Sequence, residues 1–190
     1  MVQRVSKRTA TNDYLGEIWQ QVLDGKSAAW RRLVGSLAPV VFTAARRAGL
    51  DHRDAEDCAQ QTWLDLYRGR HTVEHPSRLP VWLIRVATRK AFRLARKRSR
   101  EAEIHGMMDS PSQAPLPDEV LTDLESLAKL QLALDQLEPK CRELLQAVFL
   151  DPSDSSYADI ARRLGIPLNS LGPTRSRCLA KLRKIMNSME

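Results

Sequence analysis

The chain has 190 residues, of which 43% are hydrophobic, and a formal net charge of +7 at pH 7. This length suits one domain or two small ones, and the hydrophobic fraction is sufficient for buried cores. No apolar run approaches the roughly 20 residues of a membrane-spanning helix, and the N-terminal segment lacks the apolar core of a secretory signal. The positive charge favours an anionic partner, either nucleic acid or an anionic membrane surface.

The helices expected in the first half follow from apolar spacing of three and four residues. Residues 1–12 read as a disordered basic tail, and residues 13–23 form a short helix that ends at Asp24-Gly25-Lys26. Ser27 is the expected N-cap of a longer helix that ends at Gly49, and Pro39 should kink or divide it. An amphipathic helix then covers residues 51–69; the acids in its first turns suit the helix dipole.

The next segment, residues 69–79, is predicted to be a loop that Pro80 ends. It contains His71 and His75, which are four residues apart, a metal-ligand spacing on a helix. Here they flank a loop that contains Pro76, and no carboxylate or cysteine set converges with them. We therefore expect no metal site, and we expect no cofactor.

A basic amphipathic helix follows, from Trp82 to Arg100, with eight Lys or Arg and no acid between Arg85 and Arg100. At roughly 100° per residue, one arc is apolar: Leu83, Ile84, Ala87, Ala91, Leu94 and Ala95. The opposite arc is cationic, with Trp82 beside it: Arg85, Arg89, Arg93, Arg96, Lys97 and Arg100. A solvated face usually mixes charges of both signs, so a face with charges of one sign favours a polyanionic partner. The aromatic ring of Trp82 beside it suits a polyanion whose bases can stack.

Residues 101–119 read as a flexible acidic linker, because the segment contains three prolines and no Lys or Arg. Residues 120–190 form a second helical body, and residues 13–100 form the first. No strand pattern competes with these helices. The sequence therefore predicts an all-α protein of two small domains.

The second body has the pattern of a helix-turn-helix. Ser156 and Asp159 resemble a capping box for a short helix, Gly165-Ile166-Pro167 is a tight turn, and a last helix runs from about Ser170 to Met186. Polar and basic residues that could face DNA lie away from its apolar side: Asn169, Ser170, Pro173, Ser176, Arg177 and Lys184, with Arg162 and Arg163 at the end of the first helix. A helical hairpin with a basic surface is the structural alternative.

Three cysteines, Cys58, Cys141 and Cys178, are widely spaced and odd in number. They form no disulfide framework and no evident redox switch, which is typical of a reducing cytoplasm. The sequence contains no P-loop and no recognisable Ser/His/Asp or Cys/His arrangement for nucleophilic catalysis. We therefore expect a cytoplasmic protein that is not an enzyme.

Two segments together resemble the bacterial sigma factors of RNA polymerase. The segments DAEDCAQQTWLDLYR and LPVWLIRVATRKAFRLARKRSR resemble their second conserved region, and GKSAAWRRLV fits its start. The segments LEPKCRELLQAVFL and YADIARRLGIPLNSLGPTRSRCLAKLRK resemble the fourth region. The order, the spacing and the short linker are similar to the small extracytoplasmic-function (ECF) class. The resemblance covers about residues 13–186.

The resemblance implies a role for each body. The first would bind the clamp helices of the largest subunit of core RNA polymerase through Asp57, Gln60 and Gln61. Its loop, with His71 and His75, would hold a base flipped out of the −10 promoter element, and its basic helix, led by Trp82, would hold the opened strand. The second body would bind the polymerase flap and read the −35 element. The implied function is promoter recognition, promoter melting and transcription initiation.

The chain departs from the family pattern at several positions. Gln61 stands where Glu is usual, and Arg89 and Arg93 stand where Asn and Asp are common, so base contacts cannot be transferred to them. Pro173 is tolerated only in a first turn, so the last helix either starts near Ser170 or begins irregularly. A possible anti-sigma factor is a further partner, but no residue identifies it. Two other functions stay open: a free-standing helix-turn-helix regulator with an N-terminal dimerisation or sensing domain, and a nonspecific binder of nucleic acid or anionic membrane.

Overall fold

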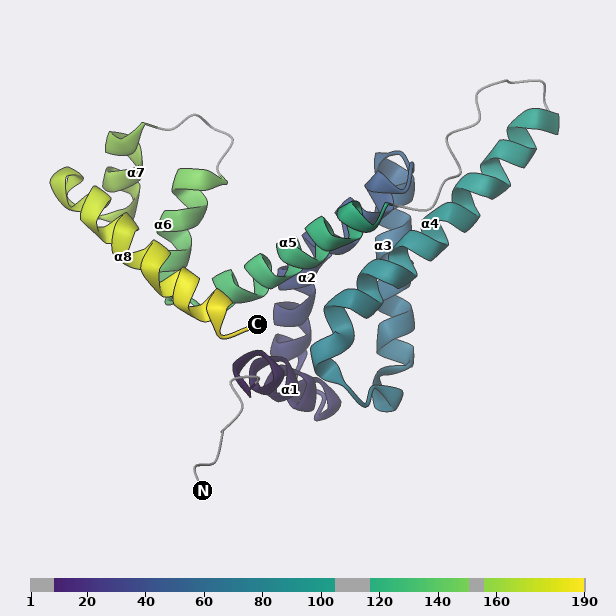
Figure 1. Cartoon of the computed structure of the whole chain (residues 1–190), viewed down its shortest axis with the longest axis horizontal. Coiled ribbons are helices and arrows are strands. Elements are labelled where there is room, and N and C mark those ends of the chain that lie inside the picture. The colour runs from purple at the N-terminus through teal and green to yellow at the C-terminus, as the bar shows by residue number, and fades with distance from the viewer. Residues whose placement is uncertain (1–8, 105–116, 151–155, 190) are drawn as a thin grey trace. The chain divides into compact units, whose positions relative to one another are not determined.

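The computed structural model of the chain describes residues 9–104, 117–150 and 156–189. The described residues form helices and two short 3-10 turns (Figure 1): α1 (Thr9–Leu23), α2 (Ser27–Arg47), α3 (His52–Arg68), η1 (Arg70–Thr72), η2 (Pro76–Arg78), α4 (Leu79–Ile104), α5 (Asp118–Gln136), α6 (Pro139–Phe149), α7 (Tyr157–Leu164) and α8 (Leu168–Asn187). The all-α prediction is confirmed. From Thr11 onward, the chain divides into two compact units, Thr11–Ala128 and Lys129–Glu190.

In the first unit, α2, α3 and α4 pack on one another around a common apolar core (Figure 1). Each helix contributes the residues that its spacing predicts: Leu33, Leu37 and Val41 from α2, Ala55, Trp63 and Leu66 from α3, and Leu83, Ile84 and Ala87 from α4. Helix α1 adds Leu15, Ile18, Trp19 and Val22 to the buried residues. Burying an apolar side chain stabilises the fold by about 1.5–3 kcal/mol, so these helices depend on packing more than on intrinsic propensity.

Helix α1 begins earlier than predicted. It starts at Thr9, so residues 9–12 are helical and do not belong to a tail. Once the apolar side of α1 is buried, each residue added at the N-terminus closes a further hydrogen bond at little cost, which extends the helix beyond its packed part. Residues 1–8 of the predicted tail lie outside the described part.

Helix α2 differs in two details from the prediction. Its N-cap is Lys26, so Ser27 is the first helical residue. The helix also continues through Pro39 without division. Pro39 and Gly35, whose carbonyl would receive the missing N–H, are both exposed, so water can satisfy that carbonyl. Gly25 accounts for the turn before α2, because its φ is +78°, which favours glycine.

The predicted linker is shorter in the structure at both ends. Helix α4 runs to Ile104, and α5 begins at Asp118. The central part of the linker, residues 105–116, lies outside the described residues, and its predicted flexibility stays a prediction. The border between the two compact units falls after Ala128, within α5. The domain limits drawn from the sequence likewise stay a prediction.

In the second unit, α6, α7 and α8 pack against one another (Figure 1). Together with the end of α5 they bury one apolar cluster. Leu144 and Leu171 are fully buried at its centre. Ser156 caps α7 by accepting from the backbone N–H of Asp159 at 3.2 Å, and its hydroxyl donates to the Asp159 carboxylate at 2.6 Å. Gly165 then ends the helix with a φ of +62°. The capping residue and the tight turn are therefore confirmed.

Helix α8 begins at Leu168, which corrects both alternatives drawn from the sequence. Pro173 is the sixth residue of the helix and lies beyond the first turn. Both Pro173 and Asn169, whose carbonyl would receive the missing N–H, are exposed. At such an exposed position, water can hydrogen-bond the carbonyl that Pro173 deprives of its helical donor.

A disulfide joins Cys141 of α6 to Cys178 of α8, so the expectation of no disulfide is wrong. The two cysteines are 37 residues apart in sequence, but their Cα atoms lie 5.3 Å apart. Sequence spacing could not show this pairing, because the fold of α6 against α8 brings the two residues together. Cys58 is buried and free.

Candidate functional site

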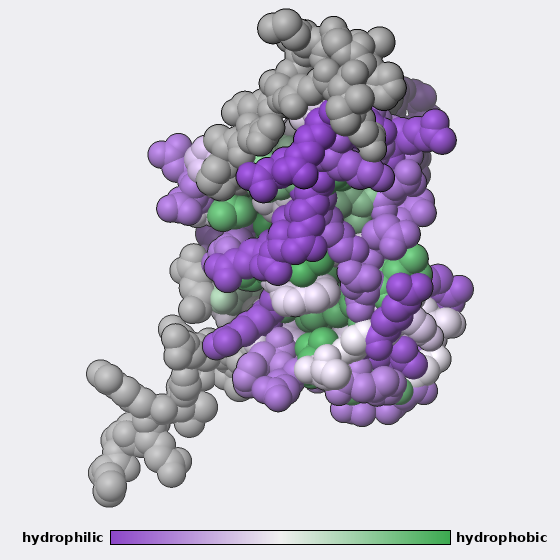
Figure 2. Space-filling model, turned by 90° about the vertical axis from the view of Figure 1, so that its right-hand side faces the viewer, coloured by the Kyte–Doolittle hydropathy of each residue, from purple (hydrophilic) through white to green (hydrophobic). Residues whose placement is uncertain are grey.

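Helix α4 has the two faces that its sequence predicts. Leu83, Ile84, Ala87 and Ala91 are buried against the first unit. Exposed side chains cover the other face: Trp82, Arg85, Arg89, Arg93, Arg96, Lys97 and Arg100. Figure 2 turns the side that carries α4 toward the reader and shows strongly hydrophilic residues with apolar residues beside them. The predicted cationic strip is therefore a surface of the folded unit.

Two further cations of α4 are bound to acids of α3. The Nζ atom of Lys90 lies 2.7 Å from an oxygen of Asp65, and the side chain of Lys90 is only 26% exposed. Arg98 is paired with Asp51 and Asp54. Within the described residues, Arg85, Arg89, Arg93 and Arg96 have no acidic partner. These four arginines are therefore the cations of α4 best placed to bind an added anion.

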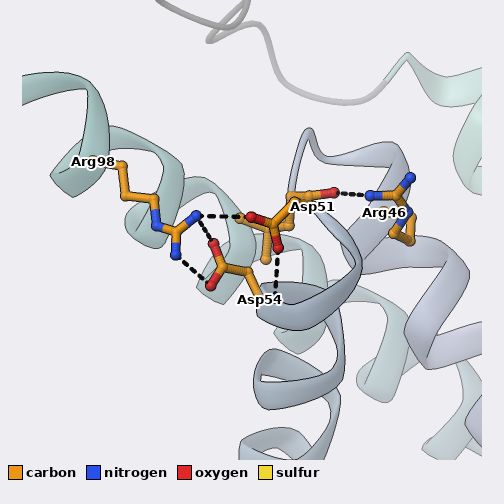
Figure 3. Close-up of polar contacts among 5 residues, drawn as sticks. Arg46, Asp51, Asp54 and Arg98 are labelled. Carbon is orange, nitrogen blue, oxygen red and sulfur yellow. Dashed lines mark hydrogen bonds and ion pairs between the residues drawn. The ribbon is translucent and has the colours of Figure 1, made fainter. Parts of the chain in front are cut away.

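Arg98 holds the beginning of α3 (Figure 3). It donates to Asp51 at 3.1 Å and to Asp54 at 2.6 Å. Asp51 is also the N-cap of α3, because its carboxylate accepts from the Asp54 N–H at 2.8 Å. That backbone hydrogen bond, followed by the one from Arg98, lowers the pKa of Asp51 below its ordinary value of 3.8. Asp51 and Asp54 therefore bind Arg98 of α4, besides their favourable interaction with the dipole of α3.

Asp57, Gln60 and Gln61 are all exposed on α3. Their spacing of three and four residues places them on one side of the helix. Leu64 continues this side one turn later and is 43% exposed, whereas Cys58, Thr62 and Leu66 face the core. The three polar residues and Leu64 form one continuous surface, which we call the α3 face.

A cavity of about 320 Å³ lies where α3 ends and α4 begins. It includes Trp82, the leading aromatic of the cationic strip, and His75 from the loop; its lining residues are Asp65, Leu66, Gly69, Thr72, Val73, Glu74, His75, Arg78, Leu79 and Trp82. Trp82 is 40% exposed. His71 is exposed on η1 and is not among the lining residues. The structure therefore separates the two histidines that the sequence grouped together.

The residues predicted to face DNA from α8 are at its surface. Asn169, Pro173, Ser176, Arg177 and Lys184 are exposed, and Ser170 is partly buried. On α7, Arg162 pairs with Asp159 at 3.1 Å, and Arg163 is exposed. The predicted set thus lies on α8 and on the end of the helix before it.

Sequence reasoning missed one residue pair of this unit. Arg175 of α8 donates a hydrogen bond to the hydroxyl of Tyr157, the first residue of α7. The guanidinium also lies 5.8 Å from the centre of the Tyr157 ring. The position of Arg175 beside the apolar side of its helix is a weak sequence signal of such a contact. The sequence does not identify its partner, which is 18 residues away. The pair links the start of α7 to α8, the helix that is predicted to face DNA.

Neither a metal cluster nor a membrane span appears in the described residues. No group of three or more His, Cys, Asp or Glu could hold a metal ion there. None of the described helices is long and apolar enough to cross a membrane.

Comparison with known proteins identifies the family. Residues 33–101 match the family model for sigma-70 region 2. This segment contains most of α2, all of α3 with its face, the cavity and the strip of α4. ECF RNA polymerase sigma factor SigE of Mycolicibacterium smegmatis is 32% identical over 152 residues, which cover 78% of this chain and 57% of SigE. The chain belongs to the ECF sigma factors.

Other relatives match this sigma factor over more of their own length. ECF sigma factor RpoE of Cereibacter sphaeroides is 26% identical over 162 residues, which cover 84% of this chain and 87% of RpoE. RNA polymerase sigma factor HrpL of Pseudomonas syringae is 26% identical over 171 residues, which cover 83% of this chain and 87% of HrpL. The family thus agrees with the resemblance seen in the sequence motifs.

Proposed function

We propose that this chain is an alternative sigma factor that binds core RNA polymerase, recognises promoter DNA and promotes its melting. The arrangement on the first unit carries the proposal. The α3 face, the cavity and the cationic strip of α4 belong to one packed unit and follow one another along two helices. One unit can therefore contact a protein partner on α3 while it holds an anionic strand on α4. We expect no catalytic activity and a cytoplasmic location.

We assign the α3 face to core polymerase. Asp57, Gln60 and Gln61 offer one carboxylate and two amides at an exposed surface, which suits a partner surface with basic and polar groups. Gln61 contributes no charge, so Asp57 is the only anion of the three. Leu64, at 43% exposure, adds an apolar contact of the kind that protein interfaces bury.

We assign the cavity to an unstacked base of the −10 element. Its volume of about 320 Å³ lies within the range of about 300–1,000 Å³ found for small-molecule pockets. Trp82 offers an aromatic surface, and stacking of a base on an aromatic side chain is worth about 1–3 kcal/mol. Unstacking a base step costs a few kcal/mol, so this binding can offset much of the cost of melting without ATP.

We assign the strip to the phosphates of the opened strand. Arg85, Arg89, Arg93 and Arg96 follow Trp82 along the exposed face of α4. A base held in the cavity would place the next phosphates beside these cations. The second unit would read the −35 element through α8, with Arg162 and Arg163 near phosphates.

A free-standing helix-turn-helix regulator is less well supported. The N-terminal domain of such a regulator would dimerise or sense a ligand. It would need neither the polar α3 face nor a cationic strip that binds single-stranded DNA. The alignments with the sigma factors RpoE and HrpL cover more than four fifths of this chain and so include residues of both units. This similarity does not favour the alternative.

Transcription with purified bacterial core polymerase and a promoter library tests the proposal directly. We expect initiation from a subset of promoters only when this chain is added. Absence of promoter-dependent initiation with every core tested, together with sequence-specific binding of duplex DNA by the chain alone, would instead support the regulator.

The α3 face can be tested against a matched surface on α1. The variant Asp57→Ala/Gln60→Ala should weaken binding to core polymerase and leave the unfolding midpoint unchanged. The control Glu17→Ala/Gln21→Ala removes the same chemical groups from exposed positions of α1. Equal core affinities of the two variants would mean that the α3 face is not the docking surface.

The cavity offers a second matched pair. His75→Ala and Trp82→Ala change its lining, whereas His71→Ala removes a histidine that is exposed outside it. We expect the first two variants to reduce the permanganate reactivity of −10 thymines in the holoenzyme, and His71→Ala to leave it unchanged. If His71→Ala is as defective as His75→Ala, the assignment of the cavity is wrong.

A further inference from the structure

Cys141 and Cys178 form a covalent link between two helices of the second unit. Cys141 lies in the first turn of α6, and Cys178 lies in the middle of α8. Their Cα atoms are 5.3 Å apart, which is within the range of about 4.4–6.8 Å that disulfides require. Helix α7, which lies between them in sequence, takes no part in the link.

The surroundings of the two cysteines suit free thiols as well as a disulfide. Cys141 is 7% exposed and Cys178 is 1% exposed, in an apolar cluster that includes Leu144 and Leu182. Free cysteine packs in such a cluster as a small hydrophobic residue. Lys181 of α8 also pairs at 2.9 Å with Glu138, the N-cap of α6. Each of the two residues lies three positions from the cysteine of its own segment. These contacts hold α6 against α8 without the disulfide, so the reduced thiols stay close together.

We propose that Cys141 and Cys178 are a redox modification site at which a peroxide converts two thiols into a disulfide that stabilises the second unit. The inference concerns the stability of this unit and does not rest on the proposed function. Nothing in the sequence spacing of the cysteines suggested such a site.

The chemistry requires two displacement steps. The Cys141 thiolate attacks one oxygen of hydrogen peroxide, the O–O bond breaks, and the leaving hydroxide takes a proton to become water. The Cys178 thiol then attacks the sulfur of the resulting sulfenic acid, an S–S bond forms, and a second water leaves. The two sulfurs are oxidised by two electrons in total, and the peroxide is reduced to two waters.

Cys141 is the thiol that we expect to react first. It is the more exposed of the two, and it lies in the first turn of α6, where the helix dipole stabilises a negative charge. Helix ends also open more readily than helix centres, which gives a small oxidant access to a buried sulfur. Cys58 differs, because the first unit contains no second cysteine with which it could form a disulfide, and burial raises the pKa of its thiol.

Mass spectrometry of the full chain tests the site. The protein is reduced, treated with hydrogen peroxide or buffer, and then alkylated under denaturing conditions. We expect alkylation of all three cysteines in the reduced sample, and of Cys58 alone after peroxide, with the peptides of Cys141 and Cys178 joined. Alkylation of all three after peroxide, or a link that includes Cys58, would overturn the proposal.

Thermal unfolding tests the consequence. A disulfide restricts the unfolded chain, so peroxide should raise the unfolding midpoint of the second unit by more than about 5 °C relative to the reduced form. Cys58→Ala should retain this shift, and Cys141→Ala and Cys178→Ala should lose it. An equal midpoint for oxidised and reduced wild-type protein would refute the stabilising role, even if a single variant fails to fold.

Discussion

Arg98, near the end of α4, donates a hydrogen bond to Asp54 in the first turn of α3, with a distance of 2.6 Å between Nη2 and Oδ1. The same guanidinium reaches Asp51, the N-cap of α3, at 3.1 Å. On the opposite side, Arg46 donates to the Leu50 carbonyl at 2.6 Å, which holds the turn before α3 (Figure 3). Because α3 carries the proposed polymerase face and α4 carries the proposed DNA strip, Arg98 fixes the two surfaces relative to each other.

Removal of Arg98 should destabilise the first unit. The Asp54 side chain is only 8% exposed, and a charged group that loses its partner in such a place costs about 1.5–3 kcal/mol. Arg98 itself is 53% exposed, so we expect Arg98→Ala to lower the free energy of unfolding by about 1–2 kcal/mol. The control Arg96→Ala should stay within about 0.5 kcal/mol of the wild type. Urea denaturation of both variants measures these free energies. Equal stabilities of Arg98→Ala and Arg96→Ala would contradict the role of Arg98.

The contribution of Asp51 should depend on pH. Its folded-state pKa is lowered by the Asp54 N–H and by Arg98. The ionised carboxylate therefore stabilises the fold above its ordinary pKa of 3.8, and this stability is lost as the pH falls below that value. Asp51→Asn keeps an N-cap oxygen but removes the charge. The stability difference between wild type and Asp51→Asn should be constant near pH 6 and should shrink below the ordinary pKa; a difference that does not change with pH would exclude this linkage.

Two adjacent cations of α4 should differ in their effect on DNA binding. Arg89 is exposed, whereas Lys90 is already paired with Asp65 at 2.7 Å. Arg89→Ala should therefore reduce affinity for a single-stranded oligonucleotide and lower the slope of log affinity against log salt by about 0.7, the value for one phosphate contact. Lys90→Ala makes the same change in net charge and should affect both quantities less. If the two variants have equal salt slopes, the strip acts only through total charge.

Pro173 should cost α8 stability. It lies in the second turn, and its missing N–H leaves the Asn169 carbonyl without a helical partner. Pro173→Ala restores that donor and should raise the free energy of unfolding of the second unit by about 1–3 kcal/mol. Pro167→Ala is the control, because Pro167 precedes the first helical residue and blocks no hydrogen bond within α8. An unchanged or lower stability of Pro173→Ala would show that the helix has fully adapted to the proline.

Much of the helical framework follows from the sequence for a local physical reason. The apolar residues of α4, such as Ile84 and Ala91, recur with the period of one helix, so their burial could be predicted together with the exposure of Arg89 and Arg93. Ser156 and Gly165 likewise mark the ends of α7 through hydrogen bonds and backbone angles that involve only near neighbours. The exposure of Asp57, Gln60 and Gln61 follows from the same period on α3.

Only the tertiary structure decided which distant residues meet. The period of α4 places both Lys90 and Arg96 outside the apolar arc, but only the packing of α4 on α3 shows that Lys90 is paired with Asp65 and that Arg98 is paired with Asp54. Similarly, His71 and His75 are equivalent in sequence, and the fold of η1 and η2 places only His75 in the cavity. The Cys141–Cys178 link joins residues 37 positions apart. Periodicity specifies the faces of each helix, whereas contacts between helices depend on how those faces pack in three dimensions.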